Sequence, residues 1–119
     1  MKKIIFISFA LITILATSCT QDFSDPTVLS GTTWRCNVNN DVTDYVEFRF
    51  TSTSTVEIWL KPKSESVYRY QPTVNLVYSI NDKTITIYAN GDPLVGVIKN
   101  KTMTFAQWVG IGIGIFIKQ

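Results

Sequence analysis

The chain has 119 residues, of which eleven are basic and nine acidic, so its formal net charge is +2. This near balance excludes the broad basic surface that nucleic-acid binding requires. The absence of histidine removes the commonest general base and metal ligand. The length suits one domain with a single modest core.

The N-terminal residues have the order of a secretory signal. Two lysines begin the chain, an apolar run covers residues 4–15, and small residues then precede Cys19. The apolar run is too short and wrongly flanked for a membrane-spanning helix. The stretch from Leu15 to Cys19 resembles the lipobox of bacterial lipoproteins, in which the cysteine is lipidated and becomes the mature N-terminus. The resemblance implies a signal peptide over residues 1–18 and lipid attachment at Cys19.

Residues 19–30 carry the lipid site, are polar, contain Pro26 and show no apolar periodicity. We therefore expect a lipidated N-terminus followed by a flexible tether. Loss of the signal removes Lys2 and Lys3, which leaves nine basic against nine acidic residues. Membrane attachment then depends on acyl chains. The lipoprotein resemblance implies an outer-membrane location, on the periplasmic or the surface side.

Cys36 has two main alternatives. It can be a small, buried apolar residue of the first strand, or it can pair with Cys19 in an ordinary secreted protein, because an oxidising compartment permits disulfides. A reactive thiol is disfavoured, since catalytic cysteines need a basic partner such as histidine.

From Gly31 onward the apolar pattern predicts strands and no helix. The expected strands cover residues 31–38, 44–51, 55–61, 73–80, 84–88, 94–99, 102–108 and 110–117. Turn residues such as Asn39-Asn40-Asp41 and Asn81-Asp82-Lys83 separate them. Residues 62–72 are irregular, with Tyr68 and Tyr70 forming a short strand or a lid. Short strands without crossover helices predict an all-β, eight-stranded antiparallel up-and-down meander that closes into a barrel.

Several motifs resemble lipocalin-like (calycin-type) proteins, in particular small lipoproteins of Bacteroides-type bacteria. They are Gly31-Thr32-Thr33-Trp34 on the first strand, Tyr45, Phe48 and Phe50 on the second, and Lys101 to Phe105 on a late strand. The resemblance implies a lipocalin-like barrel over residues 31–119, with Trp34 closing one barrel end. It implies fold and envelope location, and no activity.

We expect no enzyme, catalytic residue, cofactor or metal site. Paired carboxylates for glycoside hydrolysis would have to come from Glu47, Glu57, Glu65 and the aspartates. The alternation of their strands predicts that Glu47 and Glu57 both point to water. No glycine-rich phosphate loop or metal-ligand spacing occurs.

Aromatic side chains are the remaining candidates for a binding site. The alternation of its strand predicts an exposed Trp59, which together with Tyr68 and Tyr70 could form a patch for a glycan, a peptide or a protein. The glycines of the last strand leave two alternatives. Either isoleucines face inward and glycines outward, or inward glycines enlarge a cavity. At this length a mostly filled interior is favoured.

The expected function is a non-enzymatic binding module for a small apolar ligand or a glycan. The alternative is a protein-interaction subunit or a protease inhibitor that uses exposed loops and aromatics. Expected partners are the membrane, through the N-terminal lipid, and a small ligand or envelope protein. An internal cavity would favour ligand binding, whereas a filled barrel would favour interaction.

Overall fold

The computed structural model describes residues 21–89, 92–108 and 112–119. A short helix, α2 (Pro26–Leu29), precedes nine strands: β1 (Thr33–Val38), β2 (Asp41–Phe50), β3 (Thr55–Lys61), β4 (Tyr68–Arg69), β5 (Leu76–Asn81), β6 (Thr84–Ala89), β7 (Asp92–Lys99), β8 (Thr102–Trp108) and β9 (Gly112–Lys118). Eight of them correspond to the expected ranges, and β4 is the short strand expected around Tyr68. Within the described ranges, no helix has the length and apolarity to cross a membrane.

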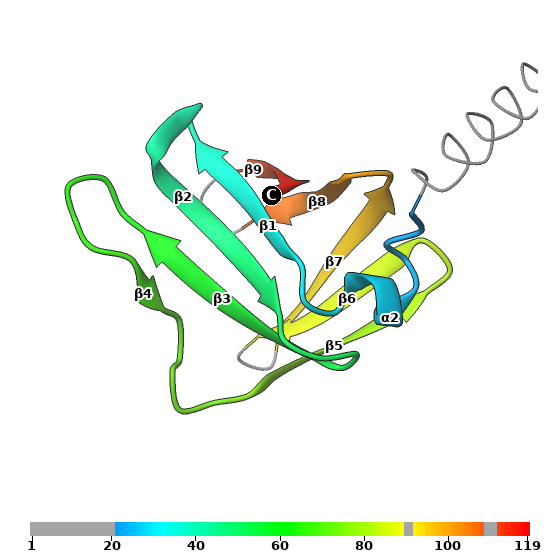
Figure 1. Cartoon of the computed structure of the whole chain (residues 1–119). Coiled ribbons are helices and arrows are strands. Elements are labelled where there is room, and N and C mark those ends of the chain that lie inside the picture. The colour runs from blue at the N-terminus through cyan, green and yellow to red at the C-terminus, as the bar shows by residue number, and fades with distance from the viewer. Residues whose placement is uncertain (1–20, 90–91, 109–111) are drawn as a thin grey trace, which may run out of the picture.

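The strands form one antiparallel sheet that closes on itself. Its neighbour order is β2-β1-β9-β8-β7-β6-β5-β3-β4, and an additional β2–β3 pairing completes the ring (Figure 1). Eight strands therefore make a closed up-and-down barrel of lipocalin-like type, as the sequence predicted. The two-residue strand β4 lies outside the ring, where it pairs with the end of β3 that β5 leaves free.

Two joints of the barrel are much narrower than the others. β1 pairs with β9 only at Trp34–Lys118 and Arg35–Ile117, and β3 pairs with β5 at only two positions. The β1–β2, β2–β3 and β6–β7 ladders each have six pairs. The barrel is thus closed, but it is held more loosely along two seams.

The tight turns use the residues that the sequence singled out. Asn39 and Asn40 have φ of 52° and 59°, and Asp82 and Asn100 have φ of 57° and 54°. Asn and Asp tolerate this left-handed region because their short polar side chains bond the local backbone. These turns fix the hairpins and thereby the inward or outward direction of each strand residue.

The barrel interior is filled with aromatic rings. Phe48 stacks on Phe116 with ring centroids 4.1 Å apart, and Phe105 meets both rings edge-on at 5.5 Å. All three side chains are fully buried, as are Trp34 and Phe50. The prediction of a mostly filled interior is confirmed for the described residues.

Of the two alternatives for the last strand, the described residues fit the inward direction of the glycine but not the cavity that was expected to follow from it. Gly114 is buried, whereas Ile115 is 51% exposed and Ile117 53% exposed. This glycine makes no ligand cavity, because it pairs across the ladder with the bulky Phe105. Ile111 lies outside the described residues.

The prediction of a flexible tether is wrong for residues 21–30. The Asp25 side chain accepts a hydrogen bond from the Thr27 amide and caps α2, and Pro26 begins the helix. Phe23 and Leu29 are buried, and the Phe23 ring meets Trp34 edge-on at 5.3 Å. Trp34 therefore closes one barrel end, as expected, with an N-terminal plug over it. Two isolated apolar residues produce no periodicity, so the sequence pattern missed this segment.

Hydrogen bonds fasten the start of this plug to the β5–β6 turn. The Asp22 carboxylate accepts hydrogen bonds from the Ser24 hydroxyl and amide, and the Lys83 Nζ donates to it at 3.0 Å. These bonds lower the pKa of Asp22 to about 2, and the bond from the Ser24 hydroxyl contributes most to the shift. The N-terminal end of the described chain therefore lies beside Lys83. Its first residue, Gln21, follows Cys19 by two positions in the sequence.

Candidate functional site

The structure does not bring together the three aromatic residues of the predicted patch. Trp59 pairs with Arg69 across the β3–β4 ladder, while Tyr68 pairs with Leu60. Because neighbouring strand residues point to opposite faces, Tyr68 and Tyr70 lie on the other side of this ladder from Trp59. Tyr68 is 50% exposed, but Tyr70 packs against the core. The proposed patch is therefore wrong as a single surface.

Trp59 is half-buried and already has partners. Its Nε1 donates to Glu57 Oε1 at 2.9 Å, and the guanidinium of Arg49 lies 4.1 Å from the ring centroid. Cation–π contacts of this kind hold the ring in place. Trp59 belongs to a network on the outer face of the barrel and is not a free binding ring.

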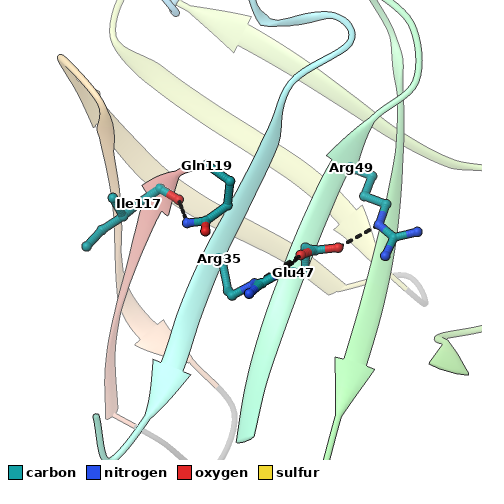
Figure 2. A network of polar contacts seen from close by, with 5 residues as sticks. All are labelled: Arg35, Glu47, Arg49, Ile117 and Gln119. Carbon is teal, nitrogen blue, oxygen red and sulfur yellow. Dashed lines mark hydrogen bonds and ion pairs between the residues drawn. The ribbon is translucent and has the colours of Figure 1, made fainter. Parts of the chain in front are cut away.

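The centre of this network is Glu47, which the sequence placed in water. Its side chain is only 2% exposed. Arg35 donates from Nε and Nη2 to Glu47 Oε1 at 3.0 and 2.7 Å, and Arg49 Nε donates to Oε2 at 2.6 Å (Figure 2). The prediction is wrong because two arginines cover the carboxylate. Arg35 is its cross-strand partner on β1, and Arg49 lies two residues further along β2.

The network extends over four strands as a charged ladder, defined by Arg35, Glu47, Arg49, Glu57, Trp59 and Arg69. Arg35 also lies over the Tyr45 ring at 4.0 Å, and Arg69 approaches Glu57 at 3.6 Å. Glu57 is partly covered, which also differs from its expected exposure. The Glu47 carboxylate is paired with two arginines, and that of Glu57 accepts from Trp59 and lies near Arg69. The arrangement therefore does not resemble an acid and base poised for hydrolysis. No cluster of three or more metal-ligating side chains occurs in the described ranges.

A groove of about 510 Å³ lies beside this ladder, at the narrow β1–β9 seam. A register shift between Asn37 and Val38 on β1, and another between Phe105 and Trp108 on β8, accompany the opening of the seam. The backbone amide of Gln119 still donates to the Thr33 carbonyl at 2.9 Å. Hydrogen bonds thus hold β1 and β9 together at the barrel end that Phe23 covers, and the two strands separate further along the seam.

The groove combines apolar walls with polar side chains. Val42, Ile115 and Ile117 supply the apolar surface, and all three are more than half exposed. The polar residues are Arg35, Asn37, Asn40 and Gln119. Carboxamides both donate and accept hydrogen bonds, and the guanidinium only donates. Because Glu47 and Tyr45 hold Arg35, its position is fixed before any ligand arrives.

Cys36 lies at the floor of the groove with a free thiol. Its side chain is buried, as expected for a small apolar residue of the first strand. Burial raises the pKa of this thiol, although the Ile115 amide, which bonds the sulfur, opposes the rise. A raised pKa leaves little thiolate, so Cys36 is a poor nucleophile. Cys19 lies outside the described residues.

The groove had no signal in the sequence, because it depends on how far β1 and β9 separate. No protein-family model, curated protein or solved structure matches the chain.

Proposed function

We propose that this protein is a lipid-anchored lipoprotein of the cell envelope that binds a glycan, without catalysis, in the groove at the β1–β9 seam. The N-terminal signal pattern and Cys19 support the anchor. The likeness to small lipocalin-like lipoproteins remains part of this proposal. The outer groove replaces the predicted aromatic patch of Trp59, Tyr68 and Tyr70 as the binding position.

One observation carries the choice of position. The interior is occupied by the stacked and edge-on rings of Phe48, Phe105 and Phe116, whereas the outer groove has a volume within the range of small-molecule sites. A small apolar ligand inside the barrel would have to displace this core. The outer groove requires no such displacement.

The residues of the groove favour a glycan over an apolar ligand. The carboxamides of Asn37 and Gln119, with the guanidinium of Arg35, match hydroxyl groups that donate and accept hydrogen bonds. The exposed Ile115 and Ile117 offer apolar surface for the C–H face of a sugar ring. The Gln119 carboxamide already donates to the Ile117 carbonyl at 2.8 Å, and Arg35 is paired with Glu47. An apolar ligand would still displace water from the Asn37 and Gln119 carboxamides without replacing its hydrogen bonds, which costs free energy.

An array of immobilised oligosaccharides tests the groove. We expect the purified full chain to retain specific glycans and the double variant Asn37→Ala, Gln119→Ala to bind them about tenfold more weakly, the effect of losing one or two net hydrogen bonds. Asn81→Ala, at the far end of β5, is the matched control and should bind like the wild type. Equal losses in both variants, or none in the double variant, would contradict the groove.

The anchor is tested separately by metabolic labelling with a fatty-acid analogue. Cys19→Ala should abolish the label and release the protein from the membrane fraction, while Cys36→Ala, with its thiol buried in the barrel, should retain both. Unchanged labelling of the Cys19→Ala chain would disprove the lipoprotein assignment without affecting the groove.

A further inference from the structure

The outer surface of the barrel is divided into a charged and an uncharged half. The charged ladder covers β1 to β4, as described above. On β5 to β9, the described residues that strand alternation directs outward are valine, isoleucine, threonine, serine, tyrosine, asparagine, proline and alanine, and Lys99 alone among them carries a charge. Asp92 at the start of β7 and Lys118 at the end of β9 are the other charged residues of these strands. We call the part of this surface on β6 to β9 the uncharged face, defined by Thr84, Thr86, Val95, Val97, Thr102, Thr104, Ile115 and Ile117.

The uncharged face is continuous across four strands. Cross-strand pairs join Thr84 to Val97, Val97 to Thr104, and Thr104 to Ile115, which makes one unbroken row. Val95 and Val97 are each 53% exposed. Half of the face is threonine, and Val95, Val97, Ile115 and Ile117 are its exposed apolar side chains. Exposed apolar side chains gathered on one uncharged surface commonly mark an interaction surface.

The chain enters the barrel beside this face. Gln21 lines the same surface hollow as Val97 and Lys99. Cys19 is two residues earlier, and two extended residues span at most about 7 Å. An acyl chain on Cys19 therefore brings the β7 end of the uncharged face to within one or two side-chain lengths of the lipid.

Three lysines lie at the same end of the barrel, together with the acidic Asp22 and Asp82. Lys83 lies in the β5–β6 turn, Lys99 ends β7, and Lys101 lies in the β7–β8 turn. Lys83 pairs with Asp22, while Lys99 and Lys101 are exposed. Lysines at the margin of an apolar surface are attracted to anionic head groups.

We propose, on the basis of the lipid anchor proposed above, that the uncharged face lies against the lipid surface, with Lys99 and Lys101 among the head groups. The anchor fixes one end of the barrel at the membrane. The difference between the charged and the uncharged half of its surface then decides which side of the barrel turns toward the lipid. Turning the charged ladder toward lipid would strip water from several charges, which costs far more than covering threonine and valine. The β1–β9 groove then opens at the border between lipid and water, because Ile115 and Ile117 belong to both surfaces.

Photo-crosslinking of the lipidated wild-type protein tests this orientation. The protein is reconstituted in vesicles of phosphatidylethanolamine and phosphatidylglycerol that contain a phospholipid with a diazirine in its acyl chain. Trypsin cuts at the lysines beside the face, so residues 84–99 and 102–118 form two peptides, and residues 36–49 and 50–63 form control peptides from the charged half. We expect at least about fivefold more lipid adducts on the two face peptides, since only that half would touch acyl chains.

A pair of matched variants sharpens the test. Val97→Asp should lower the adducts on residues 84–99 to the level of the control peptides, whereas Val74→Asp, at a comparably exposed loop valine, should not change them. Adducts spread evenly over the barrel, or concentrated on residues 36–63, would overturn the proposed orientation.

Two further outcomes also overturn it, and they are distinguishable. If the wild-type protein leaves the vesicles in salt-free buffer, the anchor itself fails. If the Cys19→Ala protein forms a dimer by light scattering and its face peptides are protected from hydroxyl-radical footprinting only at dimer-forming concentrations, a second copy covers the face.

Discussion

Gly96 shows how a single residue decides what the barrel interior can hold. A methyl group placed on its Cα would lie 2.7–2.9 Å from three ring atoms of Phe105. That ring packs edge-on against both Phe48 and Phe116, so it cannot move aside without disturbing the core. Gly96 thus makes room for a large side chain of the protein itself.

We therefore expect Gly96→Ala to lower the free energy of unfolding by about 1–3 kcal/mol, the usual cost of overpacking a core. The measurement is urea denaturation followed by tryptophan fluorescence. Val95→Ala, one residue earlier on the exposed side of β7, is the control and should change stability by about 0.5 kcal/mol or less. Similar losses in the two variants would contradict the close contact.

Glu47 is the second residue with a disproportionate role, because it neutralises two guanidinium groups from a buried position. Replacing it by glutamine keeps the shape and removes the charge. Arg35 and Arg49 remain partly exposed, with 33% and 38% of their side chains accessible, so water compensates in part. We expect Glu47→Gln to cost about 2 kcal/mol of unfolding free energy, below the range for a fully buried pair.

Glu65→Gln is the control for this prediction, because Glu65 lies exposed in the β3–β4 loop. Its effect should stay within about 0.5 kcal/mol. A Glu47→Gln protein as stable as the wild type would show that the two arginines gain as much from water as from the carboxylate.

Among the elements, the N-terminal plug changes the domain boundary. The segment from Gln21 to Ser30 closes the barrel end through Phe23 and Leu29, so the folded unit includes residues 21–30, which the sequence placed outside the barrel domain. Lys118 also lies over the Phe23 ring at 5.7 Å. The first and last parts of the domain meet at this ring.

Phe23→Ala in the full chain should therefore lower the free energy of unfolding by about 3 kcal/mol, as for other buried phenylalanines. Thermal and urea unfolding of the detergent-solubilised protein measure this loss. Val74→Ala, at a 45% exposed loop position, should have little effect. A loss below about 1 kcal/mol for Phe23→Ala would mean that the plug rests on the barrel without stabilising it.

At the scale of the whole molecule, the sequence predicted what local patterns determine. Alternation on β2 and β3 gave their inward residues, and asparagine and aspartate marked the hairpin turns. The errors concern contacts between strands. Glu47 is buried by Arg35 from a different strand, and the one-residue offset between Tyr68 and Arg69 decides which of them shares a face with Trp59. Such contacts depend on register and closure, which alternation alone does not specify.

For the proposed lipid anchor, the two-pair seam between β1 and β9 has a mechanical consequence. Tension at the N-terminal end passes through the plug to the start of β1, which pairs with β2 at six positions from Thr33 onward and with β9 at only two. Because the β1–β9 ladder has far fewer bonds, we expect it to part before the β1–β2 ladder, so that pulling widens the groove while the rest of the barrel stays closed.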